Sequence, residues 1–421
     1  MKKIIFLLLL GWMGGIPWLQ AQSNDTLQVV HYNLLNFGLD CNGEALSDRY
    51  HRLGDILDHI RPDVLTVNEV APNKLLFDGM LALSFAYSNQ IDYGDWTNQT
   101  GSNIVNQLFF NTEKLAFKST EVIPSNHLRD LNAFTLYHKA STLPGDTTFL
   151  TFIVCHWKAG DGTSDQSQRS AAATAIMDWV ALQEMDRPIF LLGDLNVGAA
   201  NETAFQTLVN HPNADIRFQE PINKQNGWAG AANAIHHTQS TRSSSGGTCG
   251  AGGGMDDRFD FILVNETIQA GNGAVSYVPE SYEVIGNDGN SYNGELQCSG
   301  NTSVPGLICV ALRELSDHLP VAMQVAISPT VGREAWWTGP RVRLLDQADS
   351  DRLGLQFAQA ASGATQVRLL DLHGRQLENQ IMEQGVLTLT FETGHLPTGM
   401  YLIQLLSTEG RILTLKWQKR I

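Results

Sequence analysis

Two polar residues that could do chemistry follow one of the most apolar stretches of the sequence. Residues 188–197 read PIFLLGDLNV, so the carboxylate of Asp194 and the carboxamide of Asn196 end a segment typical of a buried strand. Side chains two positions apart lie on the same side of an extended chain. Because ligands in α/β folds bind at the carboxyl ends of strands, we expect both side chains to face a cleft.

Polar residues occupy the ends of other apolar runs in the same way. A single Asp or Asn after a strand is usually a turn residue, and a single His is usually a structural hydrogen-bonding residue. Repetition of the pattern along one chain instead indicates a common site. The further residues in such positions are Asn33, Glu69, His156, Asp260, Asp317 and His318.

These residue types suit the hydrolysis of a phosphate ester. Carboxylates such as Glu69 supply the oxygen ligands that Mg²⁺ and Ca²⁺ prefer, and the cation would stabilise negative charge on a phosphate. A His held by an Asp is a proton-transfer pair, and Asn side chains can orient the nucleophile. The sequence has no Ser in a nucleophile elbow and no Cys in a reactive context. We therefore expect a metal-activated water as the nucleophile.

Helices and strands alternate among the elements that would position these residues. Apolar spacing over residues 46–60 and 167–184 predicts helices. Interleaved helices and strands, with some hairpins, indicate mixed sheets covered by helices, an α/β sandwich. The predicted strands are residues 27–33, 63–69, 105–110, 115–123, 133–139, 149–156, 189–194, 258–264 and 320–327.

The Gly-rich segment 240–254 could in principle cradle a phosphate. It lacks the Gly-Lys-Ser/Thr sequence of a phosphate-binding loop, and a strand, not a helix, follows it. Its composition therefore favours a flexible connector.

The N-terminus predicts export of the protein. Lys2 and Lys3 precede the apolar run 4–10, and Ala21 is a plausible cleavage site, so residues 1–21 resemble a signal peptide. A membrane anchor is the alternative, but the run is shorter than the roughly 20 apolar residues that span a bilayer. We therefore expect a secreted protein without stable membrane insertion.

Export permits disulfide bonds, and the sequence has five cysteines, an odd number. We expect Cys298 and Cys309, which bracket a polar loop, to form a disulfide. Cys155 lies in an apolar run and predicts a buried thiol.

The charge of the chain limits how it can meet a polyanion. The formal net charge is −15, and residues 22–340 carry the excess because charges nearly balance in residues 341–421. Such a domain does not attract nucleic acid by its overall charge, so a polyanionic substrate requires a local basic strip or bound cations. The charge also favours a soluble monomer.

Six motifs in order over residues 27–327 resemble the endonuclease/exonuclease/phosphatase superfamily: HYNLLNFG, RPDVLTVNEV, VCHWKAG, LLGDLN, DRFDFILV and SDHLPV. The resemblance implies a four-layer α/β sandwich over residues 22–328, with two mixed sheets flanked by helices. It also implies Glu69 as the principal metal ligand, with Asn33 beside it and Asp317 assisting. The implied cofactor is Mg²⁺, with Ca²⁺ or Mn²⁺ as alternatives.

The same resemblance implies roles for the remaining strand-end residues. Asp194 would orient or activate the attacking water, and Asn196 would fix that water and the phosphate. His318 would act on the scissile phosphate, with Asp260 as its orienting carboxylate. His156 would contact the phosphate or serve as an acid.

Finer features resemble extracellular nucleases that act on DNA or RNA. The segment HWKAGDG, followed by QRSAAA, implies phosphate contacts from Lys158 and Arg169, and HLRDLNAF implies one from Arg129. Solvated surface charges are the alternative for these residues. The chain departs from pancreatic-type enzymes in one respect, since residues 101–110 offer no acid to pair with His156.

The C-terminal part predicts a separate small domain. Residues 329–341 are rich in Gly and Pro and predict a linker, and short strands with turns predict a β-sandwich over residues 342–421. The motifs LLDLHGR, LPTGMYLIQL and LKWQKR resemble the C-terminal sorting domain of type IX secretion substrates. This resemblance implies interaction with that secretion machinery, passage through the outer membrane to the cell surface or medium, and removal of the tail. An ordinary accessory β-sandwich is the alternative.

Two other functions remain open from the sequence. A sphingomyelinase-like phosphodiesterase shares the catalytic motifs, and such an enzyme needs exposed aromatic residues to enter a membrane. Trp96 and Trp228 are the candidates, each isolated in the sequence. A non-catalytic binding protein on the same fold is the other alternative, which the presence of all six motif centres disfavours.

Overall fold

The computed structural model describes two parts of the chain. The first comprises residues 25–327 apart from 42–43, 140–147, 184–186, 225–226, 246–248 and 272. The second comprises residues 342–419 apart from 346–350, 358–364, 373, 383–385, 387 and 407–411. The predicted signal peptide and the predicted linker lie outside the described residues.

A seven-stranded mixed sheet is built around the N-terminal strand β1 (Asp25–Phe37). This strand pairs in parallel with β2 (Val64–Val70) and antiparallel with β13 (Val321–Ile327), the last strand of the first part. The order is β11-β13-β1-β2-β4-β3, with β12 also paired to β13. The remaining strands are β3 (Ile91–Tyr93), β4 (Val105–Asn111), β11 (Val275–Tyr277) and β12 (Glu283–Val284).

A six-stranded mixed sheet has the order β5-β6-β7-β8-β10-β9. Its central strands β7 (Phe149–His156) and β8 (Ile189–Asp194) are parallel, and β10 (Asp260–Asn265) runs antiparallel to β8. The three are almost wholly buried, as their continuous apolar runs predict. The outer strands are β5 (Leu115–Ile123), β6 (Leu131–His138) and β9 (Phe218–Gln219).

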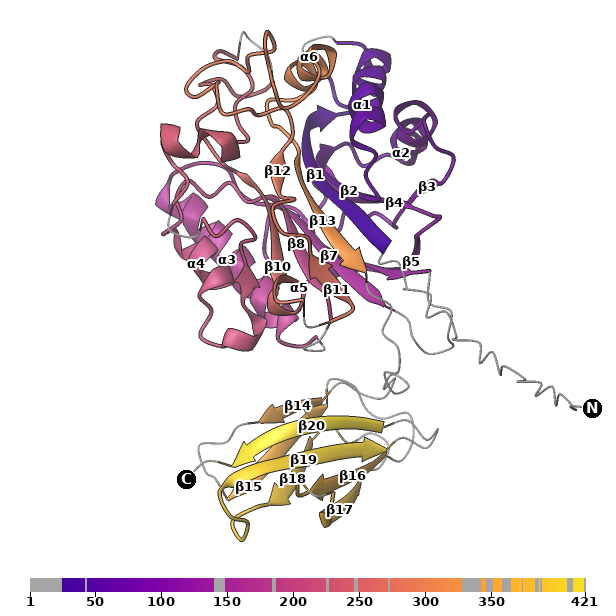
Figure 1. Cartoon of the computed structure of the whole chain (residues 1–421), viewed down its shortest axis with the longest axis vertical. Helices are drawn as coiled ribbons and strands as arrows, with labels where there is room; N and C mark the ends of the chain where they lie inside the picture. Colours follow the sequence, from indigo (N-terminus) through magenta and orange to yellow (C-terminus); the bar gives the residue numbers. More distant parts are fainter. Residues whose placement is uncertain are drawn as a thin grey trace, which may run out of the picture.

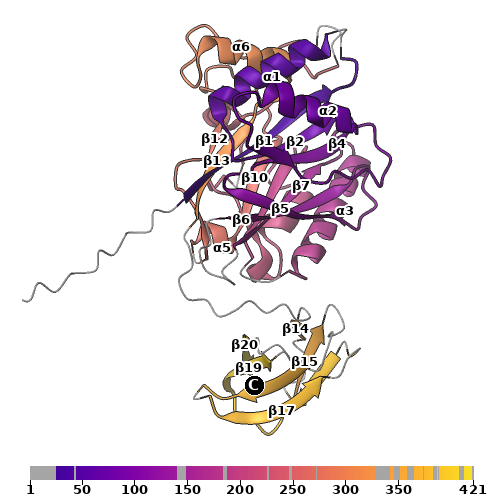
Figure 2. The same ribbon diagram turned by 90° about the vertical axis from the view of Figure 1, so that its right-hand side faces the viewer.

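Helices cover the outer faces of both sheets. Figure 1 shows α1 (Leu46–Ile60) and α2 (Lys74–Gly79) on one side, and α3 (Thr163–Val180) and α4 (Thr203–Val209) on the other. The turned view in Figure 2 shows α6 (Gly306–Leu315) beside α1. The short helices are η1 (Met80–Ser84), η2 (Ala214–Ile216), η3 (Ala231–His236) and α5 (Glu266–Gln269). The predicted four-layer α/β sandwich is confirmed.

The spacing of apolar residues explains how the helices dock. In α1, Tyr50, Leu53 and Leu57 are buried against the seven-stranded sheet, as the spacing predicts. In α3, Ala172 and Ile176 pack against the six-stranded sheet together with residues of α4. The predicted helix 167–184 is displaced, because α3 begins at Thr163 and ends at Val180.

The C-terminal part forms a small antiparallel β-structure, as predicted. One sheet has the order β14-β15-β18 and the other β17-β16-β19-β20. Leu355, Val367, Phe391 and Ile403 are among the residues of their common core. The bounds are β14 (Val342–Leu345), β15 (Arg352–Phe357), β16 (Thr365–Leu370), β17 (Gln376–Met382), β18 (Thr388–Glu392), β19 (Gly399–Leu406) and β20 (Ile412–Lys419).

The cysteines form two disulfides. The predicted bond between Cys298 and Cys309 is confirmed, and Cys155 is a buried free thiol, as expected. A second bond, which the sequence did not reveal, joins Cys41 to Cys249 across 208 residues. This bond ties the Gly-rich segment to the loop that follows β1.

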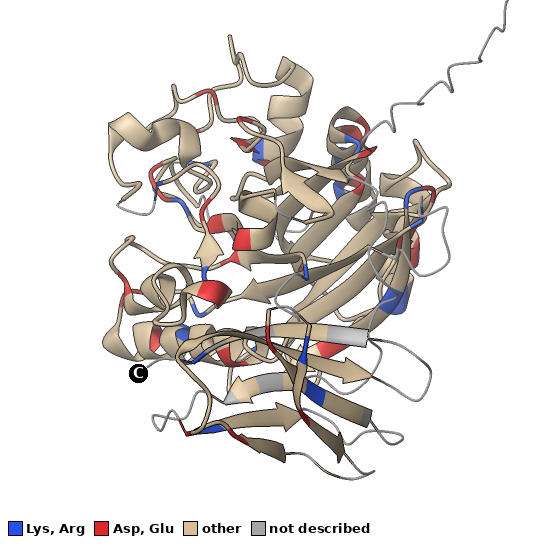
Figure 3. Cartoon of the chain, turned by 60° about the horizontal axis from the view of Figure 1, so that its bottom comes forward, with Lys and Arg blue, Asp and Glu red and all other residues tan. Residues whose placement is uncertain are grey.

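Acidic positions are spread over many elements of residues 25–327, as the red segments of Figure 3 show. Among the described residues, no helix has the length and apolar character needed to cross a membrane.

Candidate active site

The ends of five strands bring the predicted site residues together. In the six-stranded sheet, His156 of β7 is paired with Asp194 of β8, and Asp194 is paired with Asp260 of β10. In the seven-stranded sheet, Asn33 of β1 is paired with Asn68 of β2, directly before Glu69. The strand-end pattern of the sequence therefore corresponds to one cluster in space.

Asn33 lies at the centre of this cluster. Its Nδ2 donates to Glu69 Oε1 and to Asp194 Oδ2, both at 3.1 Å, and lies 3.5 Å from His318 Nε2. Its Oδ1 accepts from the Leu35 amide at 3.0 Å, which fixes the orientation of the carboxamide. Asn33 is beside Glu69, as expected, but its amide nitrogen, not its oxygen, faces the carboxylates.

The backbone around Glu69 adopts an unusual conformation. Glu69 has a φ of 59°, and the register of β2 shifts between Val67 and Val70. A non-glycine residue in this region of φ costs about 1–3 kcal/mol, and such residues cluster at functional sites. Glu69 Oε2 accepts from the amide of Asn36, which itself has a φ of 51°. The irregular last residues of β1 thus hold the Glu69 carboxylate in place.

A helix residue supports this end of β1. Arg49 of α1 is buried, and its guanidinium donates to the carbonyl oxygens of Leu34 and Leu35 at 2.7 and 2.8 Å. The same group donates to Leu315 O at 3.1 Å, at the end of α6. Arg49 therefore connects two helices to the segment that carries Asn33.

Glu69, His156 and Asp194 form a group that could hold a metal ion. One ligand atom from each lies within 4.8 Å of the others, and His156 Nε2 is 3.7 Å from Glu69 Oε1 and 3.5 Å from Asp194 Oδ2. Burial, together with the positive charge of Arg129, lowers the pKa of His156 well below its ordinary value, so the imidazole is neutral and can act as a ligand.

The charge of this group also fits a divalent cation. Burial, with the neighbouring carboxylates of Asp260 and Glu69, raises the pKa of Asp194 to about 7 against the opposing attraction of His318. A cation would relieve this crowding of negative charge. The two carboxylates are ligands of the kind that Mg²⁺, Ca²⁺ and Mn²⁺ take, whereas an imidazole is more typical of transition metals.

Asp260 and His318 form the predicted pair. Asp260 Oδ2 lies 2.7 Å from His318 Nδ1, and both side chains are buried. Burial alone would lower the pKa of His318, but the charges of Asp260 and Asp194 raise it well above its ordinary value. His318 Nε2 is 3.8 Å from Asp194 Oδ2, so the pair and the group share one site.

Asp317 is held by the Gly-rich segment. Its Oδ2 accepts from the Ala251 amide at 2.6 Å and from Gln239 Nε2 at 3.2 Å. The structure does not bring it into the group of Glu69, His156 and Asp194. Its assistance at the metal stays a prediction.

Asn196 is close to Asp194 for a reason other than the one expected. The strand β8 ends at Asp194, and Asn196 has a φ of 49°, so the chain turns and is not extended here. The Asn196 amide donates to Asp194 Oδ1 at 3.0 Å, and Asn196 Nδ2 donates to Trp157 O at 3.3 Å. The argument from strand alternation was wrong for this residue.

Of the three predicted phosphate contacts, Arg129 lies at the site. It is half-buried, donates to the carbonyl oxygens of His156 and Trp157 at 3.4 Å, and is attracted by Glu69 and Asp194. Lys158 instead pairs with Asp165 at 3.1 Å and is about one third exposed.

Arg169 requires a correction. Its side chain is 1% exposed and forms a two-pronged ion pair with Glu202, at 2.5 and 2.9 Å. It also donates to the carbonyl oxygens of Lys158 and Gly160. These contacts engage each nitrogen of the guanidinium in the interior, so Arg169 fixes the loop 158–160. It is therefore neither a phosphate contact nor a solvated surface charge.

Sequence reasoning missed His31. Its Nε2 lies 3.7 Å from Asp260 Oδ1, and its Nδ1 lies 3.0 Å from Thr66 Oγ1. Complete burial lowers the pKa of His31 to about 4, so it is a neutral group behind the Asp260–His318 pair. His31 is two residues before Asn33 in β1, and the alternation of strand side chains could have placed it on the same face.

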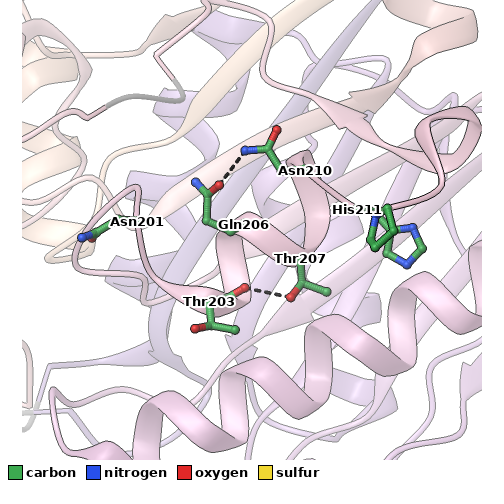
Figure 4. Close-up of a pocket in the computed structure, with 7 residues that line it drawn as sticks. Asn201, Thr203, Gln206, Thr207, Asn210 and His211 are labelled. Carbon is green, nitrogen blue, oxygen red and sulfur yellow. Dashed lines mark hydrogen bonds between the residues drawn. The ribbon is translucent and has the colours of Figure 1, made fainter.

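A polar hollow of about 340 Å³ lies at α4, apart from these residues. Figure 4 shows Gln206 bonded to Asn210 and Thr207 bonded to the carbonyl of Thr203. None of the predicted site residues lines it.

The chain is similar to several proteins of known structure. None of the curated proteins matches the chain by sequence. A solved endonuclease/exonuclease/phosphatase from Beutenbergia cavernae is 15% identical, with 93% of this chain and 99% of that chain covered and a TM-score of 0.42. TDP2 from D. rerio, complexed with a single strand DNA product, is 16% identical, with 71% and 98% covered and a TM-score of 0.44. The human Nocturnin catalytic domain with a bound sulfate anion is 13% identical, with 72% and 98% covered and a TM-score of 0.44.

The sequence pattern of one family matches residues 30–318, which is more than half of the chain and includes every strand-end residue from Asn33 to His318. The chain belongs to the Endonuclease/Exonuclease/phosphatase family.

Proposed function

We propose that the protein is a secreted, divalent-metal-dependent phosphodiesterase, a nuclease that hydrolyses DNA or RNA with a metal-activated water. Members of the family are phosphoester hydrolases, nucleases among them. The observation that carries the proposal is the convergence on Asn33 of the group Glu69, His156 and Asp194 with the pair Asp260 and His318.

The arrangement assigns a task to each part of the site. Glu69, His156 and Asp194 would hold Mg²⁺, which stabilises negative charge on a phosphate and lowers the pKa of a bound water. Asp194, buried at the end of β8, would orient the attacking water and could accept its proton. His318, kept protonated by Asp260, stabilises the charge that develops on the phosphate and can protonate the leaving oxygen.

The basic group at the site supports a phosphate substrate in an otherwise acidic protein. The carboxylates of Glu69 and Asp194 attract Arg129, which donates to the carbonyl oxygen of His156 at the end of β7. The molecule as a whole is negative, with a net charge of −15. One guanidinium and a bound cation would provide positive charge locally, at the site. Nucleic acid would then bind through contacts at the site and not through long-range attraction.

The packing of the two candidate tryptophans gives the phospholipid alternative little support. Trp228 is 2% exposed and packs against Phe205 and Phe261, while Trp96 is partly buried beside Phe77. Neither presents an exposed aromatic surface for a membrane.

We propose secretion and export through the type IX machinery on separate grounds. The sequence motifs of residues 342–421 support it, as does the small β-structure that those residues form. The two disulfides are consistent with an oxidising compartment.

One experiment separates the candidate substrates. The purified chain without residues 1–21 is incubated in parallel with plasmid DNA, RNA and sphingomyelin, each with EDTA, Mg²⁺, Ca²⁺ or Mn²⁺, and His318→Ala is the inactive control. We expect cleavage of a nucleic acid that requires a cation and is absent in the variant. Cleavage of sphingomyelin alone would establish the lipid alternative, and no cleavage under any condition would support a binding protein.

A further inference from the structure

We infer that Asn106 is a positioning residue of this active site, which holds the backbone of Asp194 through a buried chain of side-chain amides. Asn106 lies in β4 and is not among the residues that the strand-end pattern selects. The inference rests on the proposed function only in so far as Asp194 is taken to orient the attacking water.

This series consists of five hydrogen bonds, which lead from the backbone amide of Asp194 to the carboxylate of Asp130. Each group accepts from the preceding one and donates to the next, an arrangement in which successive bonds strengthen each other. The bonds are Asp194 N to Asn68 Oδ1 at 3.0 Å, Asn68 Nδ2 to Asn106 Oδ1 at 2.8 Å, Asn106 Nδ2 to Asn132 Oδ1 at 3.0 Å, Asn132 Nδ2 to Thr97 Oγ1 at 2.8 Å, and Thr97 Oγ1 to Asp130 Oδ2 at 2.5 Å.

This series of hydrogen bonds crosses between the two sheets twice. Asn68 and Asn106 belong to the seven-stranded sheet, whereas Asn132 and Asp194 belong to the six-stranded sheet. Bonds between strands of one sheet cannot fix how the two sheets sit against each other. The amide bonds can, and they do so at the edge where Glu69 of one sheet must meet Asp194 of the other.

Asn106 is the branching point of this series of hydrogen bonds. Its Nδ2 also lies 2.8 Å from the carbonyl oxygen of Asp130 and 3.2 Å from that of Val154, so its two hydrogens are shared among three acceptors. Asp130 follows Arg129, and Val154 is two residues before His156 in β7. One amide therefore contacts the residue after Arg129, the strand that ends at His156 and, through Asn68, the strand that ends at Asp194.

Burial makes the contacts of Asn106 costly to lose. Asn68 and Asn132 are fully buried and Asn106 is 2% exposed, so water cannot replace a missing partner. The three acceptors around Asn106 Nδ2 allow one orientation of the amide, which fixes the direction of the whole chain.

The structure supplies a matched control for a test. Asn265 accepts from the amide of Ile189 at 3.3 Å and donates to Arg187 O at 2.7 Å, and it too is buried. Asn265 thus holds the first residue of β8, and Asn68 holds the last. Asn106→Leu and Asn265→Leu both remove a buried carboxamide near β8, but only the first should affect Asp194.

Three measurements on the full chain test the inference: thermal unfolding, hydrogen exchange of the Asp194 amide, and the steady-state rate on the cleaved nucleic acid. Both variants should lower Tm. Only Asn106→Leu should speed exchange at Asp194, by about tenfold or more, and lower kcat per folded enzyme by about tenfold or more, with a smaller change in KM. Adding Asn68→Leu to Asn106→Leu should cost little more, because the two act as a unit.

The outcomes separate failure of the inference from failure of the proposed function. Equal exchange at Asp194 in both variants would overturn the inference, whether or not the protein cleaves nucleic acid. Faster exchange with an unchanged kcat in an active enzyme would overturn the positioning role. If Asn106→Leu does not fold, Asn68→Ala removes only the link next to Asp194, and the same exchange and rate results are expected of it.

Discussion

Two carboxylates of the site lie close together, and a metal ion would balance their like charges. Glu69 and Asp194 approach the same Asn33 nitrogen, and Asp194 is almost fully buried. Glu69→Gln keeps the shape of the side chain and removes one charge. We expect kcat to fall by about 10²-fold or more, with partial rescue at high Mg²⁺, because a weaker metal site is refilled by mass action.

Calorimetric titration of the metal gives a readout independent of activity for Glu69→Gln, and it should show weaker binding. Glu121→Gln, a change at an exposed position of β5, is the control and should leave both measurements unchanged. Full activity of Glu69→Gln at limiting Mg²⁺ would rule out the assignment.

The Asp260–His318 pair predicts a shift in pH dependence. Asp260 raises the pKa of His318, and in the proposed mechanism the protonated imidazolium is the active form, so activity should be lost as the pH rises through that pKa. Asp260→Asn lowers the pKa and should move the basic limb of the pH–rate profile to lower pH. His318→Ala alone and the double variant should lose similar activity, because the residues act as a unit.

Pre-steady-state or steady-state rates measured from pH 5 to 10 for wild type and the three variants test this cycle. Additive losses, or a basic limb that Asp260→Asn does not move, would mean that another residue supplies the acid.

The residue scale also shows what a single sequence can reveal about a site. Glu69, Asp194, Asp260 and His318 were predicted because a polar residue at the end of an apolar run stands out. His31 and the amides of Asn68, Asn106 and Asn132 were missed, because polar residues inside buried strands look like breaks in the apolar pattern. Arg169 was misassigned because its partner Glu202 lies 33 residues away and only the fold brings the two together.

At the scale of elements, long segments with a clear apolar pattern were predicted closely, the helix α1 among them, whereas turns were not. The bounds of β5, β7 and β8 agree with the predicted ranges, since β-branched and apolar runs bounded by polar residues define buried strands. The start of α3 was missed by four residues, because its N-cap is Gly162 and offers no side-chain capping signal. The positive φ of Glu69 has no signature in its residue type, whereas Asn196 is of a type that adopts positive φ more readily.

The Arg169–Glu202 pair connects α3 to the segment before α4 and predicts a loss of stability, not of substrate binding. Removing one member leaves the other charged in the interior, which costs about 3–5 kcal/mol. Arg169→Met and Glu202→Met should therefore each lower the free energy of unfolding by a similar amount, and the double variant should recover part of it. Urea denaturation measures these values. A raised KM for Arg169→Met with unchanged stability would restore the phosphate-contact hypothesis.

At the scale of the whole molecule, each described part has its own hydrophobic core. The two core clusters of the first part draw only on residues up to Ile327, and the cluster of the C-terminal part draws only on residues from Val342 onward. The disulfides also lie wholly within the first part, where the bond from Cys41 to Cys249 closes a loop of 208 residues and restricts its unfolded state. No described residue of the C-terminal part therefore contributes to the two hydrophobic cores of the first part.

Independent cores predict that the tail is dispensable for catalysis. A truncated chain of residues 22–330 keeps Asn33, Glu69, His156, Asp194 and the Asp260–His318 pair, along with both disulfides. It should fold, show the Tm of the catalytic part in the full chain, and cleave the same substrate with kcat and KM within about twofold, because no group of the site comes from the tail. In cells, the same truncation should abolish export if residues 342–421 serve secretion. A soluble, folded but inactive truncated chain would show that the C-terminal domain takes part in catalysis or substrate binding, and unimpaired export would assign it the role of an ordinary accessory domain.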